Sequence, residues 1–561
     1  LKQLLKLRKV RCLLMYDNSK YFEDIPAVEK PRSRFERSCG HKTTFDTGQL
    51  IPIFVDEVLP GDTASLDIAH VTRMTTPIVP VMDNAVMDIY SFFCPNRLVW
   101  EHWKEFCGEN NTTHWEQPVQ YEIPQLLSPA AGFDDGSLAD YLGIPTHIGG
   151  LSVNHLPFRV YAKIFNDWFR DENLKDPIMF NEDETTLQGI NKGQSYDYVT
   201  DTQLGAYPVN AAKFHDYFTS ALPEPQKGPD VFVPLGDSAP VVFSDNVAIG
   251  QTADSAIQGL GAIVIKNQSN VYSFQGLKDD DTAQAMTAST TASFSADLSS
   301  ATGATINQLR QAFAIQRFYE ALARGGSRYT EFVRNIFGVV SPDARQQRSE
   351  FLGAKRFQIN MDQVLQTSST DAVTPQGNTA AFSCTVNADD LFTYSATEHG
   401  YIMILAVIRT THTYQYGLEK MWNRKKFTDF YVPQFANLGE MPILNKEIYA
   451  QGSSVVDADG KVVDEEVFGY QEAWAEYRYK PSRVSGKLRS QATGSLDIWT
   501  YADKYSQLPM LSSEWIDETK TNLQRSLAVA EEPQFVSDFY FKSTWTRVMP
   551  VYSVPGLLDH H

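Results

Sequence analysis

The chain has 561 residues, of which 42% are hydrophobic and 12% aromatic, and its formal net charge is −19 at pH 7. This composition excludes an intrinsically disordered protein, and the length exceeds what one ordinary core can organise, so we expect several domains or one domain with large insertions. The negative charge argues against a dedicated nucleic-acid-binding protein, although local basic patches remain possible. The 28 Pro and 33 Gly favour strands and turns over long helices.

Cysteine usage and hydropathy indicate where such a chain is made. The five cysteines are odd in number, scattered and without a CxxC pair: Cys12, Cys39, Cys94, Cys107 and Cys384. This predicts free thiols and a reducing compartment. The longest apolar run, residues 401–408, is far shorter than the roughly 18 residues that span a bilayer. The charges among residues 1–14 argue against a secretory signal.

The first third of the chain reads mostly as strands. Near-alternation of Leu66, Ile68 and then Val71 predicts a half-buried strand over 65–74. The β-branched and aromatic run 85–94, closed by Pro95, predicts another. Amphipathic patterns predict a short helix over 98–107 and a longer one over 158–174.

The remaining elements follow a long irregular stretch, residues 175–304. A helix is expected from Ile306 to the Gly325–Gly326 pair, and Arg310, Arg317 and Arg324 recur on one of its faces as candidates for a subunit interface. Residues 401–417 begin as a continuous apolar run and predict a central strand. Residues 494–503 and 537–554 predict further strands, so both ends of the chain would complete one mainly β sandwich.

Charge is unevenly distributed around the irregular stretch. Residues 228–304 contain eight Asp against Lys266 and Lys278, a net charge of about −6, whereas residues 305–356 contain nine Lys or Arg against four acids, about +5. Of residues 282–305, 18 of 24 are Ala, Ser or Thr, which cannot fill a core of their own. This contrast suggests two surfaces facing different partners; chance variation over a solvated surface is the alternative.

Signatures of catalysis and of cofactor binding are missing from the sequence. It contains no GxSxG, HExxH or GxxxxGK[ST] motif. The stretch 457–466 resembles a calcium loop, but Gly460 stands at its fourth rather than its sixth position, which favours a plain β-turn. We therefore expect no enzyme activity, no cofactor and no metal site.

Two segments could contact nucleic acid. One interleaves cations for phosphates with aromatic faces for unpaired bases, and its members are Lys420, Trp422, Arg424, Lys425, Lys426, Phe427 and Tyr431. The other is a basic N-terminal arm with Lys2, Lys6, Arg8, Lys9 and Arg11, which could neutralise phosphates without sequence preference. For the first segment, a surface loop with inward-pointing aromatics is the alternative.

Several segments, in order along nearly the whole chain, resemble the major capsid protein of gokushoviruses, single-stranded DNA phages of the Microviridae. They are RSRFERSCGHKTTFDTGQLIPIFVDEVLPGDT (32–63), TTPIVPVMDNAVMDIYSFFCPNRLVWEHWKEFCGE (75–109), FHDYFTSALPEPQKG (214–228), GGSRYTEFVRNIFGVVSPDARQQRSEFLGAKR (325–356) and VYSVPGLLDH (551–560). Residues 1–14 have no counterpart in this pattern, and Met15 resembles the family-type start. Residues 228–304 are individual to this chain.

The resemblance implies a mainly β fold: an eight-stranded antiparallel jelly-roll β-sandwich with long loop insertions and a few helices. It implies self-assembly in the bacterial host cytoplasm into a T=1 icosahedral virion shell around circular single-stranded DNA. Minor virion proteins (DNA pilot, internal scaffolding and small basic DNA-binding proteins) and a host surface receptor would be further partners. The alternative is a carbohydrate-binding or glycoside-cleaving β-sandwich.

The expected organisation has four parts. Residues 1–42 form an N-terminal arm that is basic at its start, and 43–227 form the first part of the jelly roll with helical insertions. Residues 228–304 form a variable surface insertion that protrudes at the three-fold axes and serves host attachment. Residues 305–561 contain the Arg-bearing helix and the rest of the jelly roll.

Overall fold

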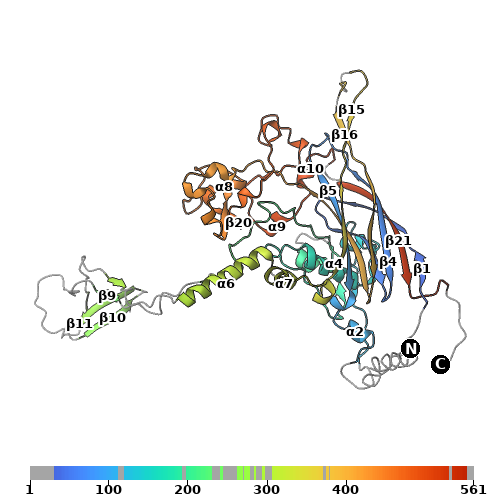
Figure 1. Ribbon diagram of the computed structural model, residues 1–561, viewed down its shortest axis with the longest axis horizontal. Helices are drawn as coiled ribbons and strands as arrows, with labels where there is room; N and C mark the ends of the chain where they lie inside the picture. Colours follow the sequence, from blue (N-terminus) through green and yellow to red (C-terminus); the bar gives the residue numbers. More distant parts are fainter. Residues whose placement is uncertain are drawn as a thin grey trace, which may run out of the picture. The chain divides into compact units, whose positions relative to one another are not determined.

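The computed structural model describes residues 31–110, 119–191, 197–229, 231, 241–243, 262–268, 271–277, 283–285, 294–296, 306–326, 328–370, 375–377, 379–529 and 533–552. The chain divides into two compact units. Gln226–Leu322 forms one, and the chain before and after it forms the other (Figure 1). The predicted insertion, residues 228–304, and most of the helix after it fall in the smaller unit.

The first large sheet of the main unit is antiparallel and five-stranded. Its strands are β1 (Ser33–Glu36), β2 (Cys39–Phe45), β4 (Thr63–Met74), β17 (Thr385–Ser395) and β21 (Phe535–Arg547). Their order is β1-β21-β4-β17, and β2 also pairs with β21, so the two ends of the described chain lie side by side. Buried residues alternate with exposed or half-buried ones along β21 as far as Thr546, which fits a sheet with one face on the core.

The second large sheet is antiparallel with the order β14-β5-β18-β3. Its strands are β3 (Ile51–Val58), β5 (Ala85–Pro95), β14 (Glu350–Gln358) and β18 (Gly400–Thr410). Every residue of β18 except Arg409 is buried, because both of its faces are covered. The sequence-predicted central strand is therefore confirmed over its continuous apolar run, but it ends at Thr410, and residues 411–417, which were expected to continue it, lie in a loop.

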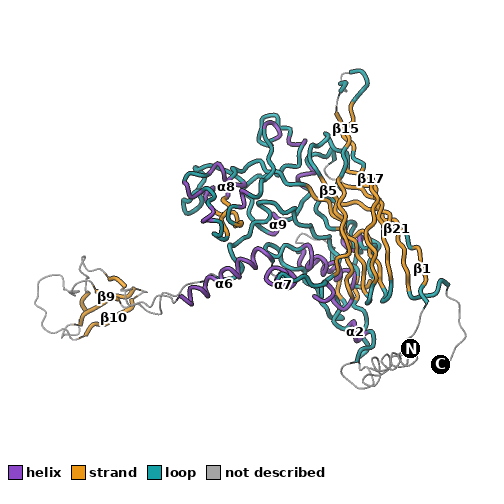
Figure 2. Tube along the Cα trace, viewed as in Figure 1, coloured by secondary structure: helices purple, strands orange, loops and turns teal. Residues whose placement is uncertain are grey.

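The main core lies between these two sheets (Figure 2). Alternate residues of β18, among them Ile404 and Ile408, meet Phe539 and Trp545 of β21 in one hydrophobic cluster. The other residues of β18, such as Met403 and Leu405, face a second cluster. Burying side chains of this size contributes about 1.5–3 kcal/mol each, so the doubly covered strand is a major source of stability.

Helical insertions cover the outer face of the second sheet. The helix α4 (Leu156–Ile164) continues as a wider π-helical turn to Phe169, and its buried side chains join the second cluster. Other short elements of this layer are α2 (Trp103–Phe106), α3 (Leu138–Tyr141), α5 (Tyr198–Asp201), β6 (Gln125–Leu127), β7 (Ser152–Asn154) and β8 (Leu187–Gln188). The sequence-predicted helix 158–174 is thus found, but it ends earlier.

A smaller lobe has a core of its own around Phe218, Ile443 and Phe468. It contains β19 (Glu440–Leu444), β20 (Val467–Glu472) and α8 (Asn445–Ile448). Elsewhere in the main unit are α7 (Tyr329–Phe337), α9 (Ser513–Ile516), α10 (Thr521–Gln524) and the hairpin of β15 (Asp362–Leu365) with β16 (Thr379–Phe382). The smaller lobe is the scaffold of the site described below.

The second unit contains short strands and most of one long helix. The strands are β9 (Val241–Phe243), β10 (Ala262–Gln268), β11 (Val271–Leu277), β12 (Ala283–Ala285) and β13 (Phe294–Ala296). They form a β10-β11-β12 sheet and a β13-β9 pair within the stretch expected to be irregular. The helix α6 runs from Ile306 to Gly325, as the sequence predicts, and Leu309 and Phe313 on it are 38% and 66% exposed.

The prediction of a mainly β chain with antiparallel sheets and a few helices is confirmed. The prediction of a strand over 494–503 is wrong. Asp497–Trp499 forms a tight turn, and the backbone N–H of Tyr501 donates to the Asp83 carboxylate instead of to a neighbouring strand. Tyr501 is buried because this loop closes the core. In β4 the buried face continues from Ile68 to His70 and Thr72. The prediction that Val71 shares this face is therefore also wrong.

Helices are otherwise short. Over 98–107 only Trp103–Phe106 is α-helical, although Trp100, Trp103 and Phe106 pack together as expected, with ring centroids 5.2–5.9 Å apart. Among the described residues, no helix combines the length and the apolar character needed to cross a membrane.

Candidate nucleic-acid interface

Two runs of the smaller lobe, residues 418–438 and 473–489, bring basic and aromatic side chains together; we call them the basic–aromatic lobe. The first run leaves the sheet after β18 and turns three times, at Lys420–Asn423, Phe427–Asp429 and Pro433–Phe435. It contains most of the sequence-predicted DNA-contact candidates. The second run returns along it after β20.

Asp429 shapes the tip of the first run. Its carboxylate accepts the backbone N–H groups of Lys425 (2.7 Å) and Lys426 (2.8 Å). These two hydrogen bonds hold the pKa of Asp429 below its usual value. The turn leaves the Lys425 and Lys426 side chains exposed, with Phe427 beside them at 76% exposure. Cations and an aromatic face are therefore offered together to solvent.

Arg424 has a different position from its lysine neighbours. Its guanidinium donates to Glu476 at 3.0 Å and stacks on the Tyr477 ring at 4.4 Å. The Arg424 and Glu476 side chains are only 11% and 12% exposed. Arg424 therefore joins the two runs of the lobe and is not presented to an outside phosphate.

The aromatic candidates also divide. Trp422 is 66% exposed, whereas Tyr431 packs edge-on against Trp474 with ring centroids 5.8 Å apart. Trp474 is buried and donates its indole N–H to the carbonyl of Phe435. Trp422 and Phe427 thus offer the more exposed faces for stacking, whereas Tyr431, 47% exposed, also packs within the lobe.

The second run supplies groups that sequence reasoning missed. They are Tyr477, Tyr479, Lys480, Arg483 and Arg489, all exposed at least in part. The stretch AWAEYRYKPSR (473–483) alternates aromatic and basic residues much as 420–431 does, so the same search criterion would have found it. Its proximity to the first run could not be seen from sequence.

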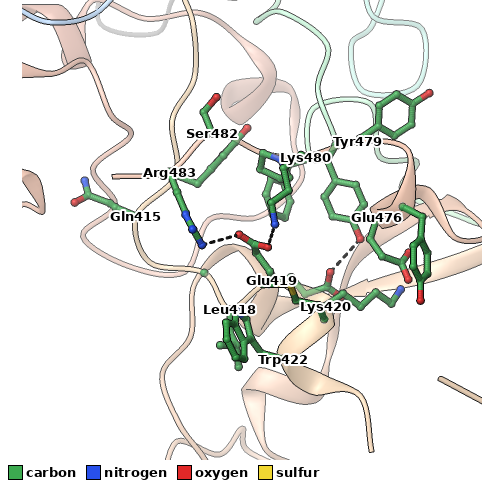
Figure 3. Close-up of a pocket in the computed structure, with 18 of the residues that line it drawn as sticks. Gln415, Leu418, Glu419, Lys420, Trp422, Glu476, Tyr479, Lys480, Ser482 and Arg483 are labelled. Atoms are coloured by element: carbon green, nitrogen blue, oxygen red, sulfur yellow. Dashed lines mark hydrogen bonds and ion pairs between the residues drawn. The ribbon is translucent and has the colours of Figure 1, made fainter. Parts of the chain in front are cut away.

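A pocket of about 350 Å³ lies between the runs (Figure 3). Its cationic lining residues are Lys420, Arg424, Lys480, Arg483 and Arg489, and its acidic ones are Glu419, Glu447 and Glu476. Glu419 forms ion pairs with Lys480 and, at 3.4 Å, with Arg483. The excess of cations over acids favours an anionic ligand.

Deeper in the pocket, Glu447 is buried and accepts the Tyr217 hydroxyl at 3.0 Å. Burial raises the pKa of Glu447, and nearby Lys420 partly offsets this rise. Lys420 itself donates to the carbonyl of Pro442 at 3.3 Å. The floor of the pocket is thus fixed, while its rim carries the exposed cations.

The other predicted site residues lie elsewhere. The basic arm Lys2, Lys6, Arg8, Lys9 and Arg11 is outside the described residues. Arg310 and Arg317 are exposed on α6. Arg324, near the end of that helix and within the main unit, pairs with Glu440 and also donates to Gln471. The three arginines therefore do not act as one stripe.

Side chains that could bind a metal are dispersed. In the part of the chain that the structure describes, His, Cys, Asp and Glu side chains form no group of three or more suited to an ion. The stretch 457–466 forms the expected turn, in which the Asp457 carboxylate accepts the backbone N–H groups of Asp459 and Lys461. The Asp457 carboxylate thus stabilises the turn by accepting hydrogen bonds from its backbone.

Comparison with known proteins identifies the chain. Residues 23–557 match the family model described as "Capsid protein (F protein)". Capsid protein VP1 of Bdellovibrio phage phiMH2K is 42% identical over 96% of this chain and 98% of its own length. The VP1 proteins of Chlamydia phage 1 (40% identity; 96% and 97%) and Spiroplasma virus 4 (43%; 94% and 95%) are similar over comparable shares. The chain therefore belongs to the capsid protein (F protein) family of the Microviridae, close to the gokushovirus capsids, and is a non-enzymatic structural protein of a phage virion.

Proposed function

We propose that this capsid protein forms a T=1 icosahedral shell around a circular single-stranded DNA genome and that the basic–aromatic lobe contacts the DNA. One observation carries the second part. Exposed cations (Lys425, Lys426) and exposed rings (Trp422, Phe427) lie on one lobe of a chain whose net charge is −19. Stacking of unpaired bases on such rings contributes roughly 1–3 kcal/mol per base.

The strand pairing supports a jelly roll as the building block of this shell. If β1 and β2 are taken as one edge strand, the two sheets hold eight strands in chain order. The first pairs with the eighth (β2 with β21), the second with the seventh (β3 with β18), the third with the sixth (β4 with β17) and the fourth with the fifth (β5 with β14). Nested pairing of this kind is what folding one long hairpin over itself produces.

The DNA-contact proposal is tested by changing Lys425 and Lys426 to Gln and leaving Arg424 intact. Particles should still assemble, because both lysines are exposed, but they should package less DNA or lose it at lower salt. The matched control changes Lys504 and Lys520, which are 56% and 52% exposed outside the lobe, to Gln. A full genome with unchanged salt stability in the lobe variant would refute the proposal.

We further propose that residues 228–304 serve host attachment. Their support is an acidic composition poor in core-forming side chains, with eight Asp against two Lys. Replacing them with a short Gly/Ser linker should leave particles that assemble but no longer adsorb to host cells. An insoluble or unfolded chain would show that the segment belongs to the core.

The remaining proposed contacts are between subunits and with other virion proteins. On α6, Arg310 and Arg317 are exposed together with Leu309 and Phe313, a mixture that suits a protein interface. Arg310→Glu with Arg317→Glu should therefore reduce assembly of an otherwise folded chain. The basic arm, the DNA pilot, internal scaffolding and small basic DNA-binding proteins, and a host receptor remain expected partners.

A further inference from the structure

We propose that the pocket of the basic–aromatic lobe holds one unpaired nucleotide of the packaged strand, that Lys480 and Arg483 bind its phosphate, and that Glu419 occupies the phosphate position when no DNA is bound. The inference rests on the proposed role of the lobe in contacting DNA. It adds a defined subsite and a residue that limits how tightly the subsite binds.

The phosphate position is inferred from the ion pairs of Glu419. Its carboxylate lies between the Lys480 ammonium and the Arg483 guanidinium, as the dashed contacts in Figure 3 show. An ammonium and a guanidinium that both reach one carboxylate can also both reach a phosphate, because a phosphate offers the same kind of oxygen acceptors. Glu419 is thus an internal anion standing where a phosphate would sit.

The exposure of Lys480 and Arg483 indicates that their ion pairs with Glu419 can break. The Lys480 and Arg483 side chains are 62% and 68% exposed, whereas Glu419 is 24% exposed. The neighbouring pair of Arg424 with Glu476 is only 11% and 12% exposed. An exposed ion pair exchanges its partner with little loss, while a buried one does not. Lys480 and Arg483, unlike Arg424, are therefore cations of the pocket that a strand can recruit.

The rest of the pocket fits the base. A volume of about 350 Å³ suits a single nucleotide, at the small end of ligand pockets. Trp422, 66% exposed, lies with Leu418 on the side of Glu419 away from the Lys480 and Arg483 heads (Figure 3). Tyr479, 48% exposed, adds a second ring to the lining. A ring for stacking and cations for phosphate are the two requirements for single-strand binding.

The consequence is that Glu419 weakens DNA binding. A phosphate that enters must displace the carboxylate, which then loses both of its partners. The variant Glu419→Gln should bind DNA more tightly, from about twofold to about thirtyfold, since two exposed ion pairs no longer compete. An internal competitor of this kind would keep the strand releasable from the shell.

The test uses the full-length chain and a fluorescently labelled single strand of ten deoxythymidines, with anisotropy measured across a range of NaCl concentrations. Glu419→Gln is compared with Glu472→Gln, which removes the same charge from an ion pair with Arg478 that lies outside the pocket lining. Tighter binding is expected only for Glu419→Gln. Its slope of log affinity against log salt should steepen by up to about 0.7 for each freed cation.

A combined variant decides whether the gain acts through the pocket. Lys480→Gln with Arg483→Gln should weaken binding, and adding Glu419→Gln to that pair should restore nothing. Equal affinities of Glu419→Gln and Glu472→Gln would overturn the proposal, as would a gain that persists without the two cations. Unchanged thermal unfolding of each variant confirms that affinities, not folding, are compared.

Two further arms separate this inference from the proposed function and identify the occupant. If the unmodified chain binds the strand and Lys425→Gln with Lys426→Gln weakens it, yet Glu419→Gln has no effect, only the nucleotide subsite fails. If no form of the chain binds the strand, the DNA-contact role of the lobe fails as well. Thymidine monophosphate should compete only weakly; strong competition would make a free nucleotide the occupant and overturn the assignment to the packaged strand.

Discussion

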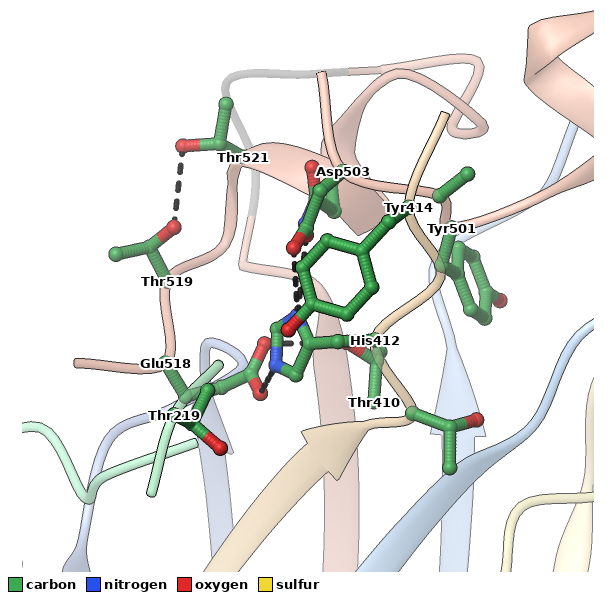
Figure 4. A network of polar contacts seen from close by, with 12 residues as sticks. Thr219, Thr410, His412, Tyr414, Tyr501, Asp503, Glu518, Thr519 and Thr521 are labelled. Atoms are coloured by element: carbon green, nitrogen blue, oxygen red, sulfur yellow. Dashed lines mark hydrogen bonds and ion pairs between the residues drawn. The ribbon is translucent and has the colours of Figure 1, made fainter. Parts of the chain in front are cut away.

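Replacing His412 with Gln should be among the most damaging single changes in the main unit. The imidazole is 2% exposed and lies between two buried carboxylates (Figure 4). Its Nδ1 lies 3.0 Å from Asp503 and its Nε2 lies 3.0 Å from Glu518. The network ties the end of β18 to two loops distant in sequence, and Tyr505 and Thr410 also donate to the carboxylates.

Charge on this imidazole follows from its partners. Burial alone would lower the pKa of His412, but the Asp503 and Glu518 carboxylates outweigh burial and raise the pKa to about 10 from 6.5. For Asp503, burial opposes ionisation, yet the imidazolium holds its pKa at about 2. The histidine contribution is therefore complete below pH 6.5 and is lost as the pH rises toward 10; the Asp503 contribution is complete above pH 3.8 and is lost as the pH falls toward 2.

The expected magnitude comes from the charges left behind. Because the Gln side chain is neutral, the buried Asp503 and Glu518 carboxylates would lose the imidazolium that lies between them. Removing one member of a buried charged network costs about 3–5 kcal/mol of unfolding free energy, because the remaining ions stay desolvated and unpaired. The loss should be largest near pH 6. Above pH 6.5 it should shrink by about 1.4 kcal/mol per pH unit, because the histidine of the unfolded chain is then neutral and the unmodified chain must take up a proton to fold with its imidazolium.

The assay is urea unfolding of the dissociated full-length chain at pH 6 and pH 9, followed by tryptophan fluorescence and far-UV circular dichroism. The control is a triple variant, His412→Gln with Asp503→Asn and Glu518→Gln, which removes all three charges and should recover much of the loss. A His412→Gln chain with the unmodified midpoint at pH 6 would refute the reasoning. An equal loss at both pH values would show that the imidazole is neutral in the folded protein.

Three further changes test other parts of the fold. Ile404→Ala in the fully buried centre of β18 should cost about 2–5 kcal/mol in urea unfolding, and a loss below about 1 kcal/mol would contradict a doubly covered strand. At Gly417 an added Cβ would lie 1.9 Å from the carbonyl oxygen of Glu447, so Gly417→Ala should distort the pocket wall and weaken oligonucleotide binding; unchanged binding would argue against the pocket. Arg424→Gln should leave Glu476 unpaired and make the lobe sensitive to protease, unlike Lys425→Gln, and equal protease resistance would contradict the clamp.

The elements that were best predicted from sequence are those in which burial determines the local order of apolar and polar residues. β18 is apolar at nearly every position because it is covered on both faces, and β4 and β21 alternate because only one of their faces is covered. The long helix α6 was found because its glycine end and its repeat are local properties. In each case a few adjacent residues contain the whole pattern.

The strand expected at 494–503 failed for a complementary reason. Ile498, Trp499 and Tyr501 look like part of a strand, and Tyr501 is indeed buried. Its burial comes from a loop that closes the sandwich, with backbone groups bonded to side chains such as Asp83 rather than to a neighbouring strand. The composition of a segment indicates that it is buried, but it does not show which groups its backbone N–H and C=O will form hydrogen bonds with.

Arg424 shows why a candidate site is harder to predict than a strand. In the sequence it stands beside Lys425 and Lys426 as one of three equivalent cations. In the fold it is the only one of these three that is paired with a nearly buried carboxylate and stacked on a ring, an arrangement that the planar guanidinium forms better than an ammonium. Its role depends on Glu476 and Tyr477, which lie about fifty residues further along the chain. Glu419 is likewise far in sequence from its partners Lys480 and Arg483. The residues that shape the pocket and limit its affinity can therefore be identified only from the fold, in which the two runs of the lobe lie together.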